Sequence, residues 1–277
     1  MEYMEEIARC AEILKKSQRL LVLTGAGISA ESGMGTYRGP DGEYSKNPSL
    51  PIALSADVFT KDRYAVWKRI DDMRVKASAA VPNEAHRILA KWEGEGRFKQ
   101  FLIATQNIDG LHQKAGSRQV SQLHGSIWEF ARPREVDFAQ DPQFAEDMVL
   151  MQYPEIRDEI LQRWSEENGQ KIWKERTLPF TEIPPDSDPD IRPNVLLYDE
   201  SYGSRLMWVE DFISRKPDVV MVIGCSGGVS ILDRLLRSCL TANPGCEIIN
   251  INPHEDCVSM PHRYLPLAAT VGVERLD

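Results

Sequence analysis

The sequence predicts an α/β fold in which a doubly wound parallel sheet carries a smaller, largely helical module. Short apolar runs recur along the chain, and each ends in a glycine-rich turn or a polar sequence; they occupy residues 20–24, 101–105, 219–223 and 248–251. Runs of this length without alternation are typical of strands buried on both faces. Stretches with helical spacing separate them, and alternating strands and helices indicate a sheet covered on both sides.

Helical spacing of apolar residues predicts several helices. Apolar residues at positions 4, 7, 8, 11 and 14 predict an amphipathic N-terminal helix, and residues 84–92 and 229–240 predict two more. Residues 40–83, with a helix expected around 63–77, and residues 131–191 do not fit the alternation. We predict that these two segments form the smaller module, and that residues 1–39, 84–130 and 192–277 form the sheet domain. The Pro- and Asp-rich run IPPDSDPDIRP at the end of the second segment is typical of a loop.

Composition excludes several classes of protein. The 277 residues carry a net charge of -9, which argues against nonspecific nucleic-acid binding, because that binding needs Lys and Arg to neutralise phosphates. No apolar run approaches the roughly 18 residues of a membrane span. The acidic N-terminal segment is unlike a secretory signal, and five cysteines without a CxxC pair favour neither a disulfide framework nor a four-cysteine zinc site. We therefore expect a cytoplasmic protein.

Four motifs could carry chemistry, and three of them directly follow predicted strands. Gly25-Ala26-Gly27 could bring backbone amides close to a phosphate, although such a fragment is equally typical of a tight turn. The sequence Gln106-Asn107-Ile108-Asp109-Gly110 could place an amide and a carboxylate over a ligand, but alone it favours a turn.

The other two motifs contain a histidine and a cysteine. His124, followed by Gly125, is a possible general base, since an imidazole accepts a proton near neutral pH; a lone His is more often structural. Gly224-Cys225-Ser226 could contact a phosphate or ribose, and Cys225 fits a small buried thiol better than a nucleophile, because no His and acid stand at a recognisable spacing.

Taken in order, these motifs resemble those of the sirtuins, the NAD-dependent protein-lysine deacylases. The series is GAGIS-x-ESG-x-x-x-YRG from residue 25, PNxAH from 82, TQNIDGLH from 105, LHG from 123, RPxV from 192, GxS from 224 and IN at 251–252. The resemblance covers about residues 20–130 and 192–255. It implies a Rossmann-like NAD domain, a smaller module and an acyl-lysine peptide bound between them.

The resemblance also implies roles for individual residues. The residues expected to be catalytic are His124, which takes a proton from a ribose hydroxyl, and Asn107. The residues expected to hold NAD are Gly25, Ala26, Gly27, Ile28, Ser29, Tyr37, Arg38, Gln106, Asn107, Ile108, Asp109, His124, Gly224, Cys225, Ser226 and Asn252. The substrate peptide is expected at Leu196, Tyr198 and Val229. Nicotinamide, free lysine and O-acyl-ADP-ribose are the expected products, and no metal is expected.

The sequence departs from the family pattern at four places. Residues 131–191 contain no cysteine, where sirtuins usually have two CxxC pairs, so we expect helical packing around Trp164 and Trp173 in place of zinc. Gly35-Thr36 replaces Pro-Asp in the cofactor loop, and Asp199 replaces a Gly of the substrate strand. The Tyr and Arg that grip acidic acyl groups fall near Ile70 and Met73, which favours acetyl or a longer apolar chain.

Two alternatives stay open at the level of sequence. An NAD glycohydrolase or protein ADP-ribosyltransferase could use the same scaffold, with water or a protein side chain attacking the ribose. A non-catalytic module that binds NAD or ADP-ribose is less favoured, because His124, Asn107 and Asp109 are all present. Oligomeric state and target protein do not follow from the sequence.

Overall fold

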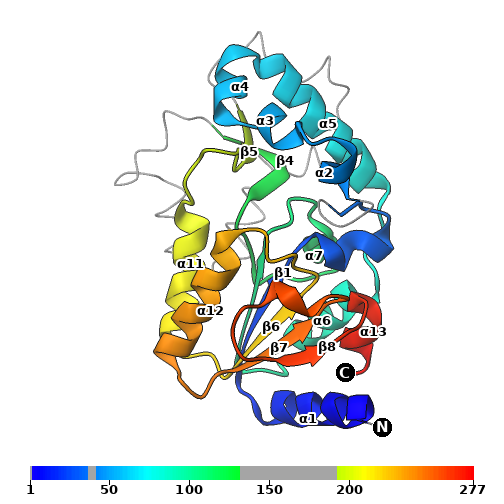
Figure 1. Cartoon of the computed structure of the whole chain (residues 1–277), viewed down its shortest axis with the longest axis vertical. Coiled ribbons are helices and arrows are strands. Elements are labelled where there is room, and N and C mark those ends of the chain that lie inside the picture. The colour runs from blue at the N-terminus through cyan, green and yellow to red at the C-terminus, as the bar shows by residue number, and fades with distance from the viewer. Residues whose placement is uncertain (1, 37–41, 132–191) are drawn as a thin grey trace.

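The computed structural model describes residues 2–36, 42–131 and 192–277. At its centre lies a six-stranded parallel sheet with the strand order β3-β2-β1-β6-β7-β8 (Figure 1). The strands are β1 (Arg19–Thr24), β2 (Gln100–Thr105), β3 (Val120–Gln122), β6 (Val219–Ile223), β7 (Glu247–Ile251) and β8 (Arg263–Leu265). The order reverses between β1 and β6, as it does in the dinucleotide-binding doubly wound fold. The predicted fold class is therefore confirmed.

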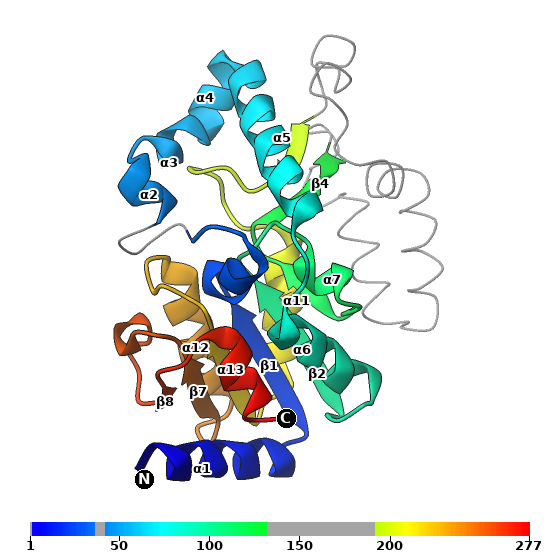
Figure 2. The same cartoon turned by 90° about the vertical axis from the view of Figure 1, so that its right-hand side faces the viewer.

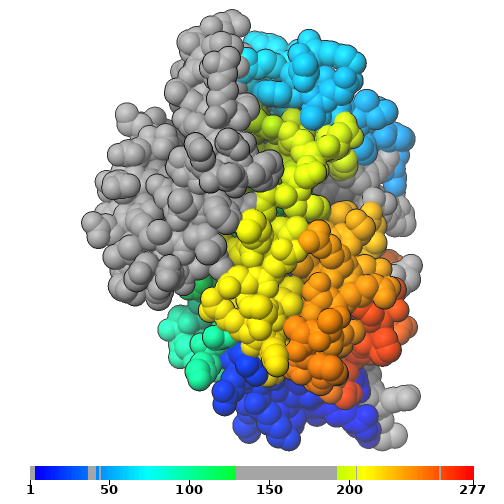
Figure 3. Space-filling model, turned by 90° about the vertical axis from the view of Figure 1, so that its left-hand side faces the viewer, coloured from blue at the N-terminus to red at the C-terminus, as the bar shows by residue number. Residues whose placement is uncertain are grey.

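Helices cover both faces of the sheet because alternate strand residues point to opposite sides. Leu20, Val22 and the residues of the other strands that point to the same side pack with α1 (Glu2–Lys16), α6 (Glu84–Gly94) and α13 (Ala269–Glu274). Leu21 and Leu23 face the other side and pack with α11 (Ser204–Ser214) and α12 (Ser230–Ala242). Figure 3 shows α11 and α12 side by side on the outer surface of that layer. The four predicted apolar runs are the cores of β1, β2, β6 and β7.

A smaller part lies beyond the carboxyl ends of the strands (Figures 1 and 2). It contains α2 (Glu43–Lys46), α3 (Leu50–Ala53), α4 (Ala56–Lys61) and α5 (Arg63–Ala79), together with the antiparallel pair β4 (Gly125–Ala131) and β5 (Arg192–Val195). A hydrophobic cluster separate from those of the sheet joins these elements; it includes Leu54, Val66, Ile70, Trp128 and Val195. The helix expected around 63–77 corresponds to α5. Residues 132–191, including Trp164 and Trp173, lie outside the described residues, and the domain boundaries stay a prediction.

Short connections complete the chain. They are the 3₁₀ helices η1 (Ala26–Ser32) and η5 (Glu255–Cys257) and the single turn of α7 (Leu111–Lys114). Within the described ranges, no helix is long and apolar enough to cross a membrane.

Candidate active site

Four of the predicted motifs converge at the carboxyl edge of the sheet. Gly25 follows β1, Gln106 follows β2, Gly224 follows β6 and Asn252 follows β7. Because β1 and β6 are neighbours with parallel register, the loops after them meet where the strand order reverses. Ligands of doubly wound folds bind in the crevice at this point.

The loops after β1 and β6 pack backbone against backbone. The amide of Gly27 donates a 2.9 Å hydrogen bond to the carbonyl of Gly224, and the amide of Gly25 donates to Ile223 at 3.1 Å. A Cβ on Gly27 would lie 2.7 Å from the Cα of Gly224, and a Cβ on Gly224 would lie 2.3 Å from the nitrogen of Ile28. Gly224 also has a φ of +63°, which L-residues rarely adopt. The glycines thus let the two loops pack directly on each other, and bulkier residues would not fit.

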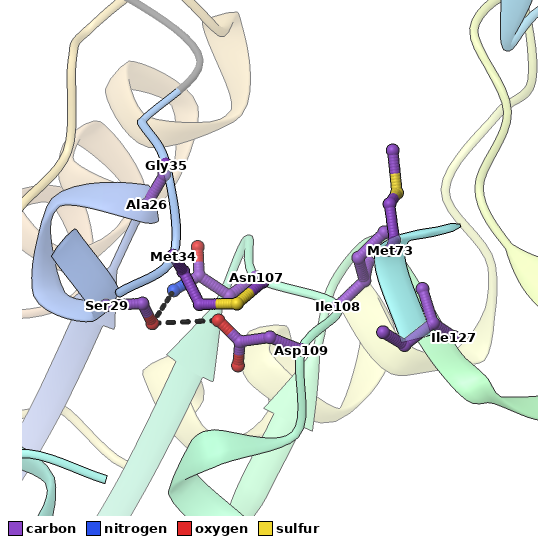
Figure 4. A pocket seen from close by; sticks show the side chains of 9 residues that line it. All are labelled: Ala26, Ser29, Met34, Gly35, Met73, Asn107, Ile108, Asp109 and Ile127. Carbon is purple, nitrogen blue, oxygen red and sulfur yellow. Dashed lines mark hydrogen bonds between the residues drawn. The ribbon is translucent and has the colours of Figure 1, made fainter. Parts of the chain in front are cut away.

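Ser29, Asn107 and Asp109 form one hydrogen-bonded chain beside the glycines (Figure 4). Asn107 Nδ2 donates to Ser29 Oγ at 3.1 Å, and Ser29 Oγ donates to Asp109 Oδ2 at 2.8 Å. Asn107 Nδ2 also donates to the carbonyl of Gly25 at 3.1 Å. The loop after β2 is therefore fixed to the loop after β1 through both protons of one amide group.

The carboxylate of Asp109 is held in a protein interior. Its side chain is 7% exposed, and burial raises its pKa, although hydrogen bonds from the Leu111 amide and the Ser29 hydroxyl oppose the shift. Its own carbonyl accepts a 2.8 Å bond from Trp128 Nε1. A buried carboxyl of raised pKa at the mouth of a pocket is a frequent feature of functional sites.

The pocket at this edge has a polar side and an apolar side. Ser29, Asn107 and Asp109 form the polar side, while Ile108, Met73 and Ile127 lie across from them (Figure 4). Ala26, Met34 and Gly35 complete the lining. This mixture suits a flat ring that carries one amide group, since the ring packs on apolar side chains and the amide bonds with the polar ones.

His124 lies at the end of β3 and has both ring nitrogens in hydrogen bonds. Nδ1 is 2.9 Å from the carbonyl of Gln106, and Nε2 is 3.0 Å from the hydroxyl of Tyr202. Burial lowers the pKa of His124, partly offset by the bond to Gln106. The imidazole is consequently neutral at pH 7, which is the form that a general base requires.

Gln106, Cys225 and Asn252 extend the site along the sheet edge. Gln106 Nε2 is 3.8 Å from Cys225 Sγ. Cys225 is buried, and burial raises the pKa of its thiol well above the usual range, so the sulfur stays protonated and is no nucleophile. Asn252 Nδ2 donates to Asn250 Oδ1. Ser226 is exposed on the outer rim.

The residues predicted for the substrate lie on the other side of His124. The amide of Leu196 donates to the carbonyl of His124 at 2.9 Å. Tyr198 pairs with the small module, accepting from the Ala56 amide and donating to the Leu54 carbonyl, each at 3.0 Å. Asp199 has a φ of +79°, so it adopts the backbone conformation that favours glycine.

The other predicted site residues are Val229, Tyr37 and Arg38. Val229 is half-buried and immediately precedes α12. Tyr37 and Arg38 lie outside the described residues. Within the part of the chain that the structure describes, no group of three or more His, Cys, Asp or Glu side chains could hold a metal ion.

Sequence reasoning missed three residues of this site. Met34 and Ile127 line the pocket, and Tyr202 contacts His124. Met34 is an unspecified position of the glycine-rich motif, and the other two residues lie outside every motif. Tyr202 is 78 residues from His124, and no local pattern signals a contact of that kind. Only the position of Met34 within the glycine-rich loop could have drawn attention to it.

Fold and site together define a dinucleotide-binding protein of the Rossmann type. Residues 25–230 match the model of the Sir2 family, and the chain belongs to that family. It is 31% identical to an NAD-dependent protein deacylase of Aeropyrum pernix over 96% of this chain and 91% of the relative. It is 34% identical to an NAD-dependent protein deacylase of Aquifex aeolicus over 93% of both chains.

Solved structures give the same result. The chain is similar to a Sir2 homologue in complex with NAD, with a TM-score of 0.71 and 28% identity over 97% of this chain and 92% of the other. It is also similar to a mutant Sir2 homologue in complex with 2'-O-acetyl ADP-ribose, with a TM-score of 0.70, 28% identity, and coverage of 97% and 94%.

Proposed function

We infer that this member of the Sir2 family is an NAD-dependent protein-lysine deacylase, and we propose that His124 is its general base. One observation carries the assignment of the base. A half-buried, neutral imidazole lies between the nucleotide crevice and the segment at Leu196, with its ring orientation fixed by a main-chain carbonyl. The relatives named above are NAD-dependent protein deacylases, and the chain covers more than nine-tenths of each.

The crevice fits NAD. We propose that the pyrophosphate lies at the glycine loops after β1 and β6, which pack so closely that a Cβ on Gly25, Gly27 or Gly224 would meet main-chain atoms within 3.0 Å. We propose that Gly224, Cys225, Ser226 and Asn252 face the adenosine half, and that Gln106 lies on the side of the reacting ribose. When bound, NAD supplies the ribose that accepts the acyl group and the bond to nicotinamide that is broken.

Ser29, Asn107 and Asp109 fit the nicotinamide end. We propose that the Asp109 carboxylate accepts a hydrogen bond from the carboxamide NH2, while Ile108 packs against the ring. The pocket offers that carboxylate in a buried setting, where a charge-assisted hydrogen bond is stronger than in water. Ser29 and Asn107 keep the loops after β1 and β2 together, so the pocket holds its shape.

His124 provides the proton transfer. Its Nδ1 proton is donated to the Gln106 carbonyl, so Nε2 carries the lone pair that accepts a proton from a ribose hydroxyl. The same carbonyl then stabilises the imidazolium, because a carbonyl oxygen attracts the positive charge. A positioned base of this kind contributes about 10²- to 10⁴-fold to a rate.

The acyl-lysine segment is proposed to lie along Leu196, Tyr198 and Val229, and the first of these hydrogen-bonds with the His124 carbonyl. An extended peptide can add itself to exposed backbone by β-augmentation. For the acyl chain we propose acetyl or a longer apolar group. Met73 and Ile127 line the pocket, and Ile70, one turn before Met73 on α5, is buried in the apolar cluster, so none of these three side chains supplies a cation for a carboxylate.

An NAD glycohydrolase or ADP-ribosyltransferase is the second candidate. One observation favours it: the backbone amide and carbonyl of Tyr198 already pair with residues 54 and 56, and Asp199 stands where a glycine is expected. These contacts leave fewer backbone groups in this segment for a peptide.

One experiment separates the two. The protein is incubated with NAD and an acetyl-lysine peptide library, and the products are followed by mass spectrometry. O-acetyl-ADP-ribose identifies the deacylase, peptide-independent ADP-ribose the glycohydrolase, and a peptide that gains ADP-ribose the transferase. His124→Ala should abolish deacylation while NAD still binds, and full activity in that variant would refute the assignment of the base.

A further inference from the structure

The phenolic hydroxyl of Tyr202 lies within hydrogen-bond distance of His124 Nε2, the nitrogen that acts as the base in the proposed function. Its oxygen is 3.0 Å from His124 Nε2, and the two ring centroids are 5.7 Å apart. Tyr202 lies in the loop between β5 and α11, outside every motif discussed above. The inference that follows rests on the proposed role of His124.

The direction of this hydrogen bond is fixed by the other ring nitrogen. His124 Nδ1 faces the carbonyl of Gln106 at 2.9 Å, and a carbonyl can only accept, so Nδ1 carries the proton. In the neutral imidazole Nε2 is then an acceptor. The Tyr202 hydroxyl therefore donates to Nε2, and it occupies the single lone pair of that nitrogen.

A substrate hydroxyl needs the same lone pair. Two donors cannot both align with one in-plane lone pair of an imidazole, so the Tyr202 hydroxyl and a ribose hydroxyl exclude one another there. We propose that Tyr202 is a positioning residue that caps the base: its hydroxyl holds the imidazole of His124 in place and leaves Nε2 when a substrate hydroxyl arrives.

Tyr202 and His124 lie next to elements that contact each other, and these contacts keep the Tyr202 hydroxyl aligned with Nε2 of His124. Tyr202 packs against the hydrophobic cluster beneath α11 and α12. The first turn of α11 is tied to β3, because Ser121 Oγ donates to the Arg205 carbonyl at 2.7 Å and Arg205 Nη1 donates to the Gln122 carbonyl at 3.2 Å. β3 ends two residues before His124. The loop of Tyr202 and the loop of His124 thus share an anchor.

A second arrangement of the same atoms is a relay, in which Tyr202 takes the substrate proton and passes its own to Nε2. Burial raises the pKa of Tyr202, which disfavours a stepwise relay through a phenolate, whereas a concerted relay would keep the phenol protonated. The cap needs no change in the protonation of Tyr202. The observations therefore favour a cap over a stepwise relay, and the experiment treats either relay as an outcome.

The test is Tyr202→Phe, which removes the hydroxyl and keeps the ring. The matched control is Tyr64→Phe, which removes an exposed hydroxyl from α5. The pKa of His124 is read by NMR of the imidazole in the protein without substrate. In the described ranges, Tyr202 is the titratable side chain that hydrogen-bonds with His124. No charged side chain contributes to the shift of the His124 pKa.

We expect the pKa of His124 to rise by about half a unit to one unit in Tyr202→Phe, because a bond donated to the neutral imidazole is lost. Above that pKa, kcat/KM for an acyl-lysine peptide should rise about two- to tenfold, since nothing competes for Nε2. Tyr64→Phe should leave both values unchanged.

Two results would overturn the cap. An unchanged pKa of His124 would mean that no bond is donated, and an unchanged or lower kcat/KM would mean that the hydroxyl is neutral or acts as a relay. If Tyr202→Phe does not fold, 3-fluorotyrosine at position 202 takes its place. As a stronger donor it should lower both the pKa of His124 and kcat/KM. The pKa measurement needs no activity, so its outcome is independent of whether His124 is the catalytic base.

Discussion

The hydroxyl of Ser29 donates a 2.8 Å hydrogen bond to the carboxylate of Asp109, and both side chains are buried. Ser29 lies on η1 after β1, whereas Asp109 follows β2, so this bond closes the pocket across two neighbouring strands. A buried carboxylate is costly to the fold, and a site that retains one does so for binding or chemistry.

Asp109→Asn should make the protein more stable and less active. Burial raises the pKa of Asp109 above its unfolded value, so the folded state is penalised once pH exceeds about 4, and the penalty persists at pH 7. The neutral amide removes this cost and keeps both contacts, because its oxygen accepts from the Leu111 amide and its NH2 donates to Ser29 Oγ. A gain of about 1 kcal/mol raises Tm by about 2–4 °C in a protein of this size.

The measurements for Asp109→Asn are thermal unfolding at pH 7 and KM for NAD. We expect a higher Tm together with a KM for NAD raised about tenfold, the loss of one charge-assisted bond. Asp72→Asn, on the exposed face of α5, removes the same charge and serves as the control. A lower Tm for Asp109→Asn than for the control would contradict this account.

Gly224→Ala should destabilise the fold by more than about 2 kcal/mol. Its Cβ would lie 2.3 Å from the Ile28 nitrogen at a φ of +63°, so overpacking and backbone strain add. Gly94→Ala is the control, since a Cβ at the end of α6 meets nothing within 4 Å, and it should add up to about 1 kcal/mol. Urea unfolding measures both, and equal stabilities would show that the two loops move apart freely.

The pH dependence of deacylation should reflect His124. Burial lowers its pKa below the ordinary value of 6.5, so the base stays neutral as pH falls from 8 to 6.5. We expect kcat/KM to be constant over that window and to decline only at lower pH, as Nε2 becomes protonated. A decline beginning above pH 7 would mean that His124 has a raised pKa or that another group is the base.

Much of the sheet could be predicted from sequence because its strands are apolar on both faces. The run at 219–223 is β6 without change, and β1, β2 and β7 each begin one residue earlier than predicted. β3 contains Ser121 and Gln122, and β8 contains Arg263, so neither three-residue strand stands out as an apolar run. β4 and β5 pair across more than 60 residues, a contact that no local pattern specifies.

The candidate site likewise has a part that local sequence signals predict and a part that they do not. Glycines and the Asn-x-Asp motif are local signals, and the structure brings Gly27, Gly224, Asn107 and Asp109 together. The contact between Tyr202 and His124 depends on how α11 docks on β3, which tertiary packing decides.

Activity should not depend on zinc. Residues 131–191 contain no cysteine, and all five cysteines of the chain lie elsewhere and are buried. We expect metal analysis of the purified protein to give far less than one zinc per chain, and Tm to be unchanged after dialysis against a chelator. Stoichiometric zinc, or unfolding upon chelation, would refute the prediction, since structural zinc contributes directly to folding.

Asp199→Gly should tighten peptide binding and relieve strain at once. Asp199 has a φ of +79°, and a non-glycine residue there costs about 1 kcal/mol, although Asp tolerates it better than most. Glycine removes that cost and also lets a peptide backbone approach the segment that begins at Leu196.

Lys216→Gly is the matched control, because Lys216 has a φ of +59° but lies at the end of α11. Both variants should gain up to about 1 kcal/mol in urea unfolding, whereas only Asp199→Gly should lower KM for an acetyl-lysine peptide. An equal change of KM in both variants would show that the effect comes from backbone strain alone, and an increase of KM in Asp199→Gly would mean that the carboxylate itself binds the peptide.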